Sequence, residues 1–246
     1  MKIKYYELSE IYEIPLKHFL PEGAVTGFIT AVHGFGGDKE SSAIEALAER
    51  MTARGFAVTA FDLPAHGTSK ADGYFCTANC CLDLTAVFEH ACRLYPEAER
   101  KAIFATSFGG YVALNSLDAL PADVRLVLRA PAVDMRATFE RLLPVTLDEY
   151  KRAGFVKMGF ERRFNVPYTF YSELCEKDIS RTDMQREMLI IHGSKDDIVL
   201  PEHTARFCEA NPKARLEIIE GAGHRFKGKG ELERVVELAE EYMTAQ

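Results

Sequence analysis

The sequence predicts an α/β protein in which a mostly parallel sheet is covered by helices on both faces. Short apolar runs of strand length alternate with amphipathic segments of helical period along the chain, which is the pattern of consecutive β–α–β units. Several of the runs are apolar throughout, as expected for parallel strands that are buried on both faces. Together these two observations favour the α/β class.

The first half of the chain starts with two strands and then enters this alternation. The strands are expected to meet near Ser9 and Glu10 in a hairpin, and Gly55 is a natural stop for the first helix. The second helix carries Leu82, Ala86 and Cys92 at helical spacing. In chain order the predictions are strands at 3–8, 11–19 and 25–32, a helix at 41–54, a strand at 56–61 and a helix at about 79–95.

The second half repeats the alternation on either side of one long interruption. The predicted elements are a strand at 101–106, a helix at 108–119, strands at 124–129 and 188–192, a helix at 201–210, a strand at 214–219 and a helix at about 231–244. In such sheets, reactive residues gather at the loops beyond the carboxyl ends of the strands. The functional site is therefore expected at that edge.

The interruption, residues 132–186, is longer than one crossover helix requires. It contains eight aromatic residues, and long insertions in compact domains are often binding elements. We therefore predict a single domain over 1–246 with an inserted cap at 132–186, although some of the rings must form a small core of their own. The residues expected to form a pocket wall are Phe155, Phe160, Phe164 and Tyr168.

Composition excludes several classes of partner. The 246 residues carry a net charge of −7, and no basic face for nucleic acid or anionic lipid is visible. The group Arg225, Lys227 and Lys229 is short and is interpreted as part of a solvated loop. No apolar run is long enough to span a bilayer and the N-terminus lacks a signal core. Six cysteines match no zinc or disulfide spacing, so we predict a cytoplasmic protein with reduced thiols.

Ser107 stands where the predicted strand 101–106 turns into the next helix. A serine held for reaction at such a turn needs small residues two positions before and after it, because the helix crosses close to the strand. Gly109 meets this need, whereas Ala105 departs from the usual glycine. The alternative is that Ser107 only caps the helix.

A base and an acid follow later in the chain, each after a predicted strand. A serine hydroxyl attacks a carbonyl carbon only if a base takes its proton, and an acidic partner must orient that base. His224 lies in a glycine-flanked loop after the last strand, and HGSKDDIV after the preceding strand offers Asp196 and Asp197. The order Ser, Asp, His predicts one hydrogen-bonded site. His33, His66 and His192 are interpreted as organisers of turns and loops, and their pattern gives no metal-ligand framework.

At this point the sequence resembles the α/β-hydrolase-fold serine hydrolases over essentially its whole length. Within that family it is most similar to small bacterial carboxylesterases of the cinnamoyl/feruloyl esterase type. In the second of the five motifs, Pro64-Ala65 alters the family pattern D-x-x-G-H-G-x-S. The motifs are HGFGG at 33–37, DLPAHGTS at 62–69, SFGG at 107–110, HGSKDDIV at 192–199 and GAGH at 221–224.

The resemblance implies roles for individual residues. It assigns Ser107 as nucleophile, His224 as base and Asp196, rather than Asp197, as the orienting acid. It assigns the oxyanion hole to the backbone N–H groups of Phe35 and Phe108, the latter at a helix N-terminus where donors are unsatisfied. No metal or organic cofactor is implied.

The expected function is hydrolysis of small or aryl esters, hydroxycinnamoyl esters included, through an acyl-enzyme. A thioesterase, a lipid esterase and a peptidase of the same fold remain alternatives, because one triad serves many reactions. A catalytically inactive binding protein is an alternative of another class. The expected partner is a small-molecule ester, with no nucleic acid and no membrane, and a homodimer is left open.

Overall fold

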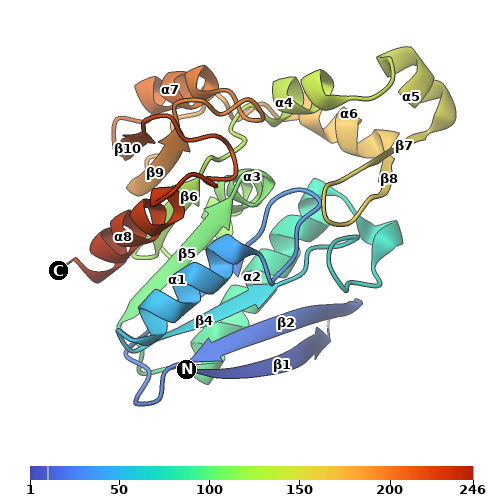
Figure 1. The fold of residues 1–246 in the computed structure, drawn as a ribbon. Helices are drawn as coiled ribbons and strands as arrows, with labels where there is room; N and C mark the ends of the chain where they lie inside the picture. The colour runs from blue at the N-terminus through green and yellow to red at the C-terminus, as the bar shows by residue number, and fades with distance from the viewer. Residues whose placement is uncertain (10, 246) are drawn as a thin grey trace.

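An eight-stranded sheet forms the centre of the computed structural model, which describes residues 1–9 and 11–245 (Figure 1). The strand order is β1-β2-β4-β3-β5-β6-β9-β10. β1 and β2 form an antiparallel hairpin, β2 is antiparallel to β4, and all other neighbours are parallel. The strands are β1 Lys2–Ser9, β2 Glu13–Leu20, β3 Gly27–Val32, β4 Phe56–Phe61, β5 Arg100–Thr106, β6 Arg125–Arg129, β9 Met188–Gly193 and β10 Ala214–Ile219.

Helices cover both faces of this sheet. α1 and α8 pack together on one face, over a core that includes Phe104 and Ile191. α2, α3 and α7 contribute to the larger core on the opposite face. The helices are α1 Ser42–Thr52, α2 Thr77–Leu94, α3 Phe108–Asn115, α7 Pro201–Ala210 and α8 Glu231–Thr244, with short 3-10 turns at η1 Asp72–Tyr74 and η2 Leu117–Ala119. Within the described residues, no helix combines the length and apolar character needed to cross a bilayer.

The predicted fold class is confirmed. Glu10, in the predicted N-terminal turn, lies outside the described residues. The helix predicted to end at residue 119 ends at Asn115 and continues as the 3-10 turn η2. In α2 the buried face is formed by Cys80, Leu84, Val87 and Phe88, whereas Leu82 is 61% exposed. The helical spacing of apolar residues through Leu82 did not identify the buried face of α2, because several apolar side chains of this helix point toward solvent.

Residues 130–187 connect β6 to β9 and contribute no strand to the main sheet. In Figure 1 this segment lies beyond the carboxyl ends of β5 and β6. Its two short strands form a separate antiparallel pair whose turn approaches the loop after β3, because the N–H groups of Glu161 and Arg162 both donate to the carbonyl of Gly36 at 2.9 Å. The elements are α4 Met135–Leu142, α5 Leu147–Ala153, β7 Phe155–Met158, β8 Phe164–Pro167 and α6 Tyr168–Glu176.

Candidate active site

Ser107 is held in a strained backbone conformation between β5 and α3. Its φ of 53° and ψ of −115° lie in a region that L-residues rarely occupy. The turn is tight, because a Cβ at Gly109 would lie 2.5 Å from the His33 carbonyl oxygen. Ala105 is fully buried, so a small residue suits that position as well. The serine side chain makes no capping hydrogen bond to α3, so the strain serves another purpose than capping.

The structure brings Ser107, His224 and Asp196 into one hydrogen-bonded chain. The Ser107 Oγ lies 3.1 Å from His224 Nε2, and His224 Nδ1 lies 2.7 Å from Asp196 Oδ2. A carboxylate only accepts hydrogen bonds, so His224 Nδ1 carries the proton and Nε2 is free to accept the serine hydroxyl. In this tautomer His224 can act as a base toward Ser107.

Asp196 is buried and held from both sides. Its Oδ1 accepts the backbone N–H groups of Ile198 at 2.9 Å and Val199 at 2.8 Å. Burial alone raises the pKa of this carboxyl, but hydrogen bonds from His192 and His224 outweigh burial and hold the pKa well below its ordinary value. The Asp196 carboxylate therefore stays charged, while the neighbouring Asp197 is exposed.

His192 contacts Asp196 directly, a contact that the sequence motifs did not predict. Its Nε2 lies 3.1 Å from Asp196 Oδ2 and 3.0 Å from the Val199 carbonyl oxygen. The Thr204 hydroxyl lies 2.9 Å from His192 Nδ1. A neutral His192 that donates from Nε2 and accepts at Nδ1 satisfies all these partners. In the sequence, only the spacing of four residues between His192 and Asp196 could have indicated this contact.

The HGFGG loop passes directly over the serine. A Cβ at Gly34 would lie only 3.2 Å from Ser107 Cβ, so the backbone around Gly34 and Phe35 borders the space in front of the hydroxyl. The ring of His33 lies behind this loop, where Nδ1 donates to the Gly34 carbonyl at 2.8 Å and Nε2 accepts the Leu63 N–H at 3.2 Å. His33 thus organises the loop, as predicted.

A buried ion pair fastens this loop to DLPAHGTS. Lys39 Nζ lies 2.6 Å from Asp62 Oδ2, and both side chains are almost fully buried. The Asp62 carboxylate also accepts backbone N–H groups of Lys39 and Thr68, each at 2.8 Å. Ala65, which stands where the family pattern has glycine, has a left-handed φ of 64°. The departure from the motif therefore keeps the glycine-like backbone.

His66 lies inside an aromatic cluster beside the site. Its Nδ1 donates to the Pro64 carbonyl at 2.8 Å, and its ring packs against Phe35, Phe75 and Phe164. Burial lowers the pKa of His66 to about 3. The neutral ring shapes the loop, in line with the sequence interpretation. In the part of the chain that the structure describes, no three His, Cys, Asp or Glu residues are grouped to hold a metal ion.

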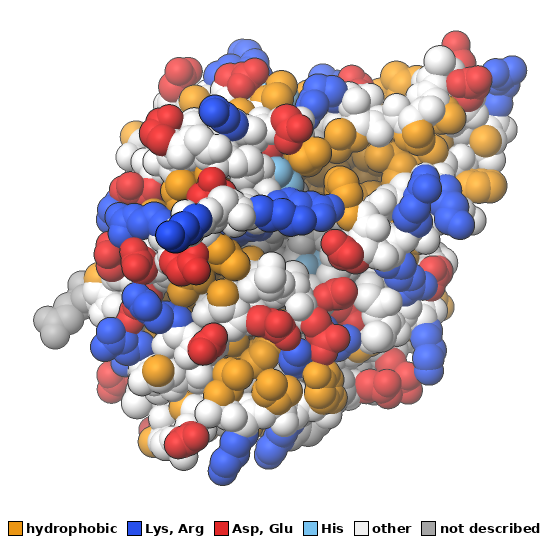
Figure 2. Space-filling view, in the orientation of Figure 1, with side chains coloured by type: hydrophobic (Ala, Val, Ile, Leu, Met, Phe, Trp, Pro, Cys, Tyr) orange, Lys and Arg blue, Asp and Glu red, His pale blue; other side chains and the backbone are white. Residues whose placement is uncertain are grey.

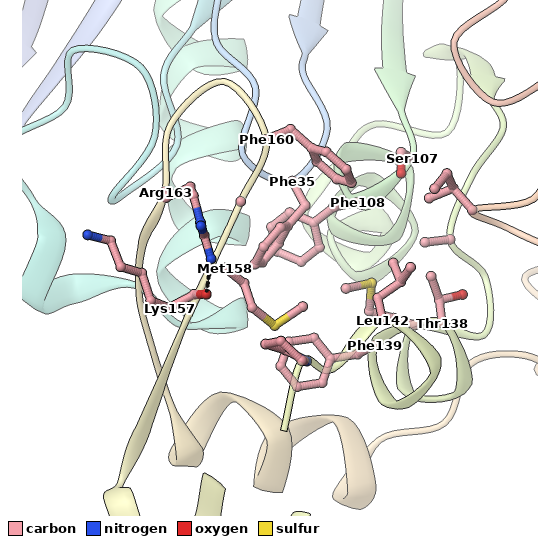
Figure 3. Close-up of a pocket in the computed structure, with 15 residues that line it drawn as sticks. Phe35, Ser107, Phe108, Thr138, Phe139, Leu142, Lys157, Met158, Phe160 and Arg163 are labelled. Carbon is pink, nitrogen blue, oxygen red and sulfur yellow. Dashed lines mark hydrogen bonds between the residues drawn. The ribbon is translucent and has the colours of Figure 1, made fainter. Parts of the chain in front are cut away.

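An apolar cavity of about 210 Å³ opens on one side of Ser107 (Figure 3). Most of its wall comes from α4 and from the β7–β8 hairpin. Arg163 donates to the Lys157 carbonyl at 3.1 Å, and Figure 3 shows the Lys157 ammonium directed away from the cavity. The side chains around it include Phe35, Phe108, Met135, Thr138, Phe139, Leu142, Met158, Phe160 and Ile198.

Of the four predicted wall residues, Phe160 lines this cavity and the other three do not. Phe155 is 51% exposed on the outside of the hairpin. Phe164 is buried in the cluster around His66, and Tyr168 packs on Tyr150 at 5.0 Å between ring centroids. The correction follows from strand alternation, which a segment of unknown register does not reveal. The wall residues of α4 were missed, although their helical spacing was visible.

A second, larger cleft of about 860 Å³ opens on the other side of Ser107. It is lined by His224 and by polar and charged residues, among them Arg129 at the end of β6. Phe160, which is 48% exposed, borders both spaces. In Figure 2 a band of Lys and Arg side chains crosses the middle of this face beside an apolar hollow, and small patches of His are visible above and below the band.

The comparisons with known proteins agree with this architecture. The family model described as serine aminopeptidase, S33, matches residues 23–169, more than half of the chain. The chain belongs to this family. It is a hydrolase, and the predicted α/β-hydrolase-fold serine hydrolase is confirmed. No curated protein matches the sequence.

Several solved structures share the fold over nearly the full length. A putative hydrolase from Agrobacterium vitis S4 has a TM-score of 0.83 at 17% identity, covering 99% of this chain and 100% of that one. Est1E from Butyrivibrio proteoclasticus, with ferulic acid bound, has a TM-score of 0.82 at 19% identity and covers 95% and 97%. Mouse alpha/beta hydrolase domain-containing protein 10 has 0.76 at 21% identity and covers 98% of both. At these identities the likeness shows the fold.

Proposed function

We propose that the protein is a serine carboxylesterase that hydrolyses small or aryl esters. The observation that carries this is the hydrogen-bonded chain Ser107–His224–Asp196 at the mouth of an apolar cavity. The serine is exposed to that cavity, its base has the required tautomer, and the acid is charged and fixed. This is the arrangement that acyl transfer to water requires.

The proposed reaction has two acyl-transfer steps. His224 Nε2 takes the proton of Ser107 as Oγ attacks the ester carbonyl, and the N–H groups of Phe35 and Phe108 donate to the oxyanion. Each such donor is worth about 3 kcal/mol in the transition state. His224 then protonates the departing alkoxide, leaving an acyl group on Ser107. Water, deprotonated by the same nitrogen, attacks the acyl-enzyme, and the acid leaves as Ser107 regains its proton.

The apolar cavity favours a small or flat acyl group. Its volume of about 210 Å³ is below the ~300–1,000 Å³ that encloses drug-sized ligands. Aromatic walls from Phe35, Phe139 and Phe160 suit a ring, since burial and stacking of a ring each contribute roughly 1 kcal/mol. Est1E, which has ferulic acid bound in its structure, supports including hydroxycinnamoyl esters. Long acyl chains exceed this space.

Residues 132–186 are proposed to act as the cap of this cavity. α4 and the β7–β8 hairpin supply most of its wall, and the hairpin turn is hydrogen-bonded to Gly36 next to the proposed oxyanion donor. Selectivity should therefore depend on this segment. Replacing Phe160 by Ala opens the wall that both spaces share.

An aminopeptidase activity, which the family description suggests, is disfavoured by charge. In that reaction the residue with the free ammonium group forms the acyl half of the substrate. None of the described residues that line the apolar cavity is Asp or Glu, so a buried ammonium would lack a counter-ion there. The cavity suits an uncharged acyl group instead.

The test combines variants of the triad with a panel of substrates. Ser107→Ala and His224→Ala should each fold and lose ester hydrolysis by several orders of magnitude, because triad members act as one unit. The panel compares aryl acetates, hydroxycinnamate esters, long-chain acyl esters, thioesters and aminoacyl amides. Near-native turnover by either variant, or faster hydrolysis of long-chain esters, thioesters or amides, contradicts the proposal. Failure of a fluorophosphonate to label Ser107 would point to a non-catalytic binding protein.

A further inference from the structure

The two spaces that meet at Ser107 differ in their relation to His224. His224 lines the larger cleft but not the apolar cavity. In ester cleavage the histidine protonates the departing oxygen, so the alcohol half of the substrate must lie on the histidine side. On the proposed function, the acyl half then occupies the apolar cavity and the alcohol half occupies the larger cleft. The residues that line the larger cleft therefore indicate the chemical class of the alcohol half.

Arg129 is the unusual residue of that cleft. It is the last residue of β6, lies next to the site because its carbonyl accepts the Ser107 N–H at 2.9 Å, and is only 6% exposed. One guanidinium nitrogen donates to the His224 carbonyl at 3.3 Å, and the group lies 4.7 Å above the Phe226 ring. Its Nε has no hydrogen-bond partner among the described residues.

No carboxylate of the described residues forms an ion pair with Arg129. Burial lowers the pKa of this guanidinium to about 10, and the more distant Asp196 opposes that shift, so Arg129 is charged at neutral pH. A buried charge that lacks a partner is costly. The buried guanidinium of Arg129, close to the reactive serine, is therefore available to bind an anion.

The other charged groups of the cleft lie closer to solvent. Lys227 and Lys229 are exposed and make no ion pair within the described residues, while Arg225 pairs with Glu161 at 3.7 Å. On the acidic side, Glu40 is bonded to Lys17 and Tyr5. Asp38 and Glu233 also line the cleft. The charges near solvent thus roughly balance, and the buried charge of Arg129 is left in excess.

We propose that Arg129 binds an oxyanion, a carboxylate or phosphate, on the alcohol half of the substrate. The natural substrates are then esters of a small or aryl acid with an anionic alcohol. The guanidinium presents donors in a planar fork that matches such a group. Arg225, Lys227 and Lys229, interpreted from sequence as a solvated loop, line the same cleft.

The test uses a matched pair of substrates, 3-carboxyphenyl acetate and 3-carbamoylphenyl acetate. The two have the same acyl group and similar shape, and differ in the charge on the leaving group. The kcat/KM of the wild-type protein should be about tenfold or more higher for the carboxylate ester than for the carbamoyl ester. Hydrogen bonds to charged groups strengthen binding by roughly 10- to 100-fold. Because Arg129 is buried, this preference should weaken only slightly as salt is raised. Equal rates, or a preference for the carbamoyl ester, overturn the inference without any variant.

Variants then assign the preference to Arg129. In Arg129→Gln the ratio of the two kcat/KM values should fall to near one, while Arg129→Lys should retain part of it. If Arg129 only positions His224 through its hydrogen bond to the His224 carbonyl, the variants lower kcat/KM for both esters equally and leave the ratio unchanged. The ratio therefore distinguishes binding of the anion from positioning of His224. Arg215→Gln removes the same charge from an exposed ion pair on β10 and should keep the wild-type ratio.

The outcomes distinguish this inference from the proposed function. A wild-type ratio that persists in Arg129→Gln shows that another group binds the anion and overturns the assignment to Arg129. Hydrolysis of neither ester overturns the proposed esterase activity, and the inference falls with it. Hydrolysis of both esters at equal rates leaves the esterase standing and overturns the inference alone.

Discussion

Exchanging Asp196 for Asn removes one charge while keeping the shape of the side chain, and it tests the orientation of His224. Four donors converge on the carboxylate: His224 at 2.7 Å, His192 at 3.1 Å, and the N–H groups of Ile198 and Val199 at 2.9 and 2.8 Å. An amide offers one oxygen and one NH₂ group. The two fixed backbone N–H groups will keep the oxygen, so the NH₂ group must face the imidazoles.

This inversion reverses the tautomer of His224. To accept from the NH₂ group, Nδ1 must lose its proton, and the proton then resides on Nε2, 3.1 Å from Ser107 Oγ. That nitrogen can no longer take the proton of the serine. We expect kcat to fall about 10⁴-fold, which corresponds to roughly 5 kcal/mol in the activation barrier. Stability should fall by about 1–3 kcal/mol because charge-assisted bonds to a buried group are lost.

Asp197→Asn is the matched control. Asp197 is exposed and adjacent, and surface changes usually alter stability by no more than about 0.5 kcal/mol. Since Asp196 makes the hydrogen bond to His224, kcat/KM of Asp197→Asn should stay close to the wild-type value. Both variants are assayed with 4-nitrophenyl acetate, with urea unfolding to verify that each is folded. If Asp196→Asn kept more than about a tenth of the activity, or if Asp197→Asn lost as much, the orienting role of Asp196 would be wrong.

Two further predictions concern stability. Gly109→Ala should destabilise the fold by about 3 kcal/mol or abolish it, since the new methyl group would meet the carbonyl oxygens of His33 and Val32 at 2.5 and 2.8 Å. The control Gly23→Ala, whose new methyl group would have nothing within 4 Å, should leave the free energy of unfolding unchanged in the same urea titration. Equal effects of the two variants would refute the packing argument. Burial lowers the pKa of His66 to about 3 and that of His18 to about 4, so both are neutral in the fold and bind protons on unfolding. Stability is therefore full above about pH 6.5 and is lost as the pH falls toward these values, by roughly 2 kcal/mol per histidine at pH 5. Urea unfolding at pH 7.5 and 5 measures this loss, which should be smaller in His18→Gln, and an unchanged free energy would contradict it.

Much of the fold could be predicted because its signals are local. Each main-sheet strand from β4 onward begins and ends within one residue of its prediction, since the apolar runs are short and bounded by turn residues. The proximity of Ser107, His224 and Asp196 also followed from the sequence, because loops beyond the carboxyl ends of parallel strands meet at one edge. The structure brings these three side chains into hydrogen-bond contact.

The cavity wall could not be predicted in the same way. The β7–β8 hairpin spans only four residues per strand, and a shift of one residue in register exchanges inner and outer faces. Phe155 consequently points outward, and Phe164 packs into the cluster around His66. Arg129 could not be identified for another reason. In the sequence it is simply a charged residue that ends a strand. Only the fold shows that it is buried and that no carboxylate among the described residues forms an ion pair with it.

On the proposed function, the parts of the site that fix its geometry are separate from the parts that select the substrate. Ser107, Gly34 and Gly109 depend on close approach of backbone to backbone, and the loops that surround them are joined by the buried Lys39–Asp62 pair. The cavity wall is instead formed by side chains of α4 and the hairpin, such as Met135 and Phe160. A change of wall side chain alters the volume offered to the acyl group without moving the serine. Substrate preference in this protein can therefore change independently of the catalytic geometry.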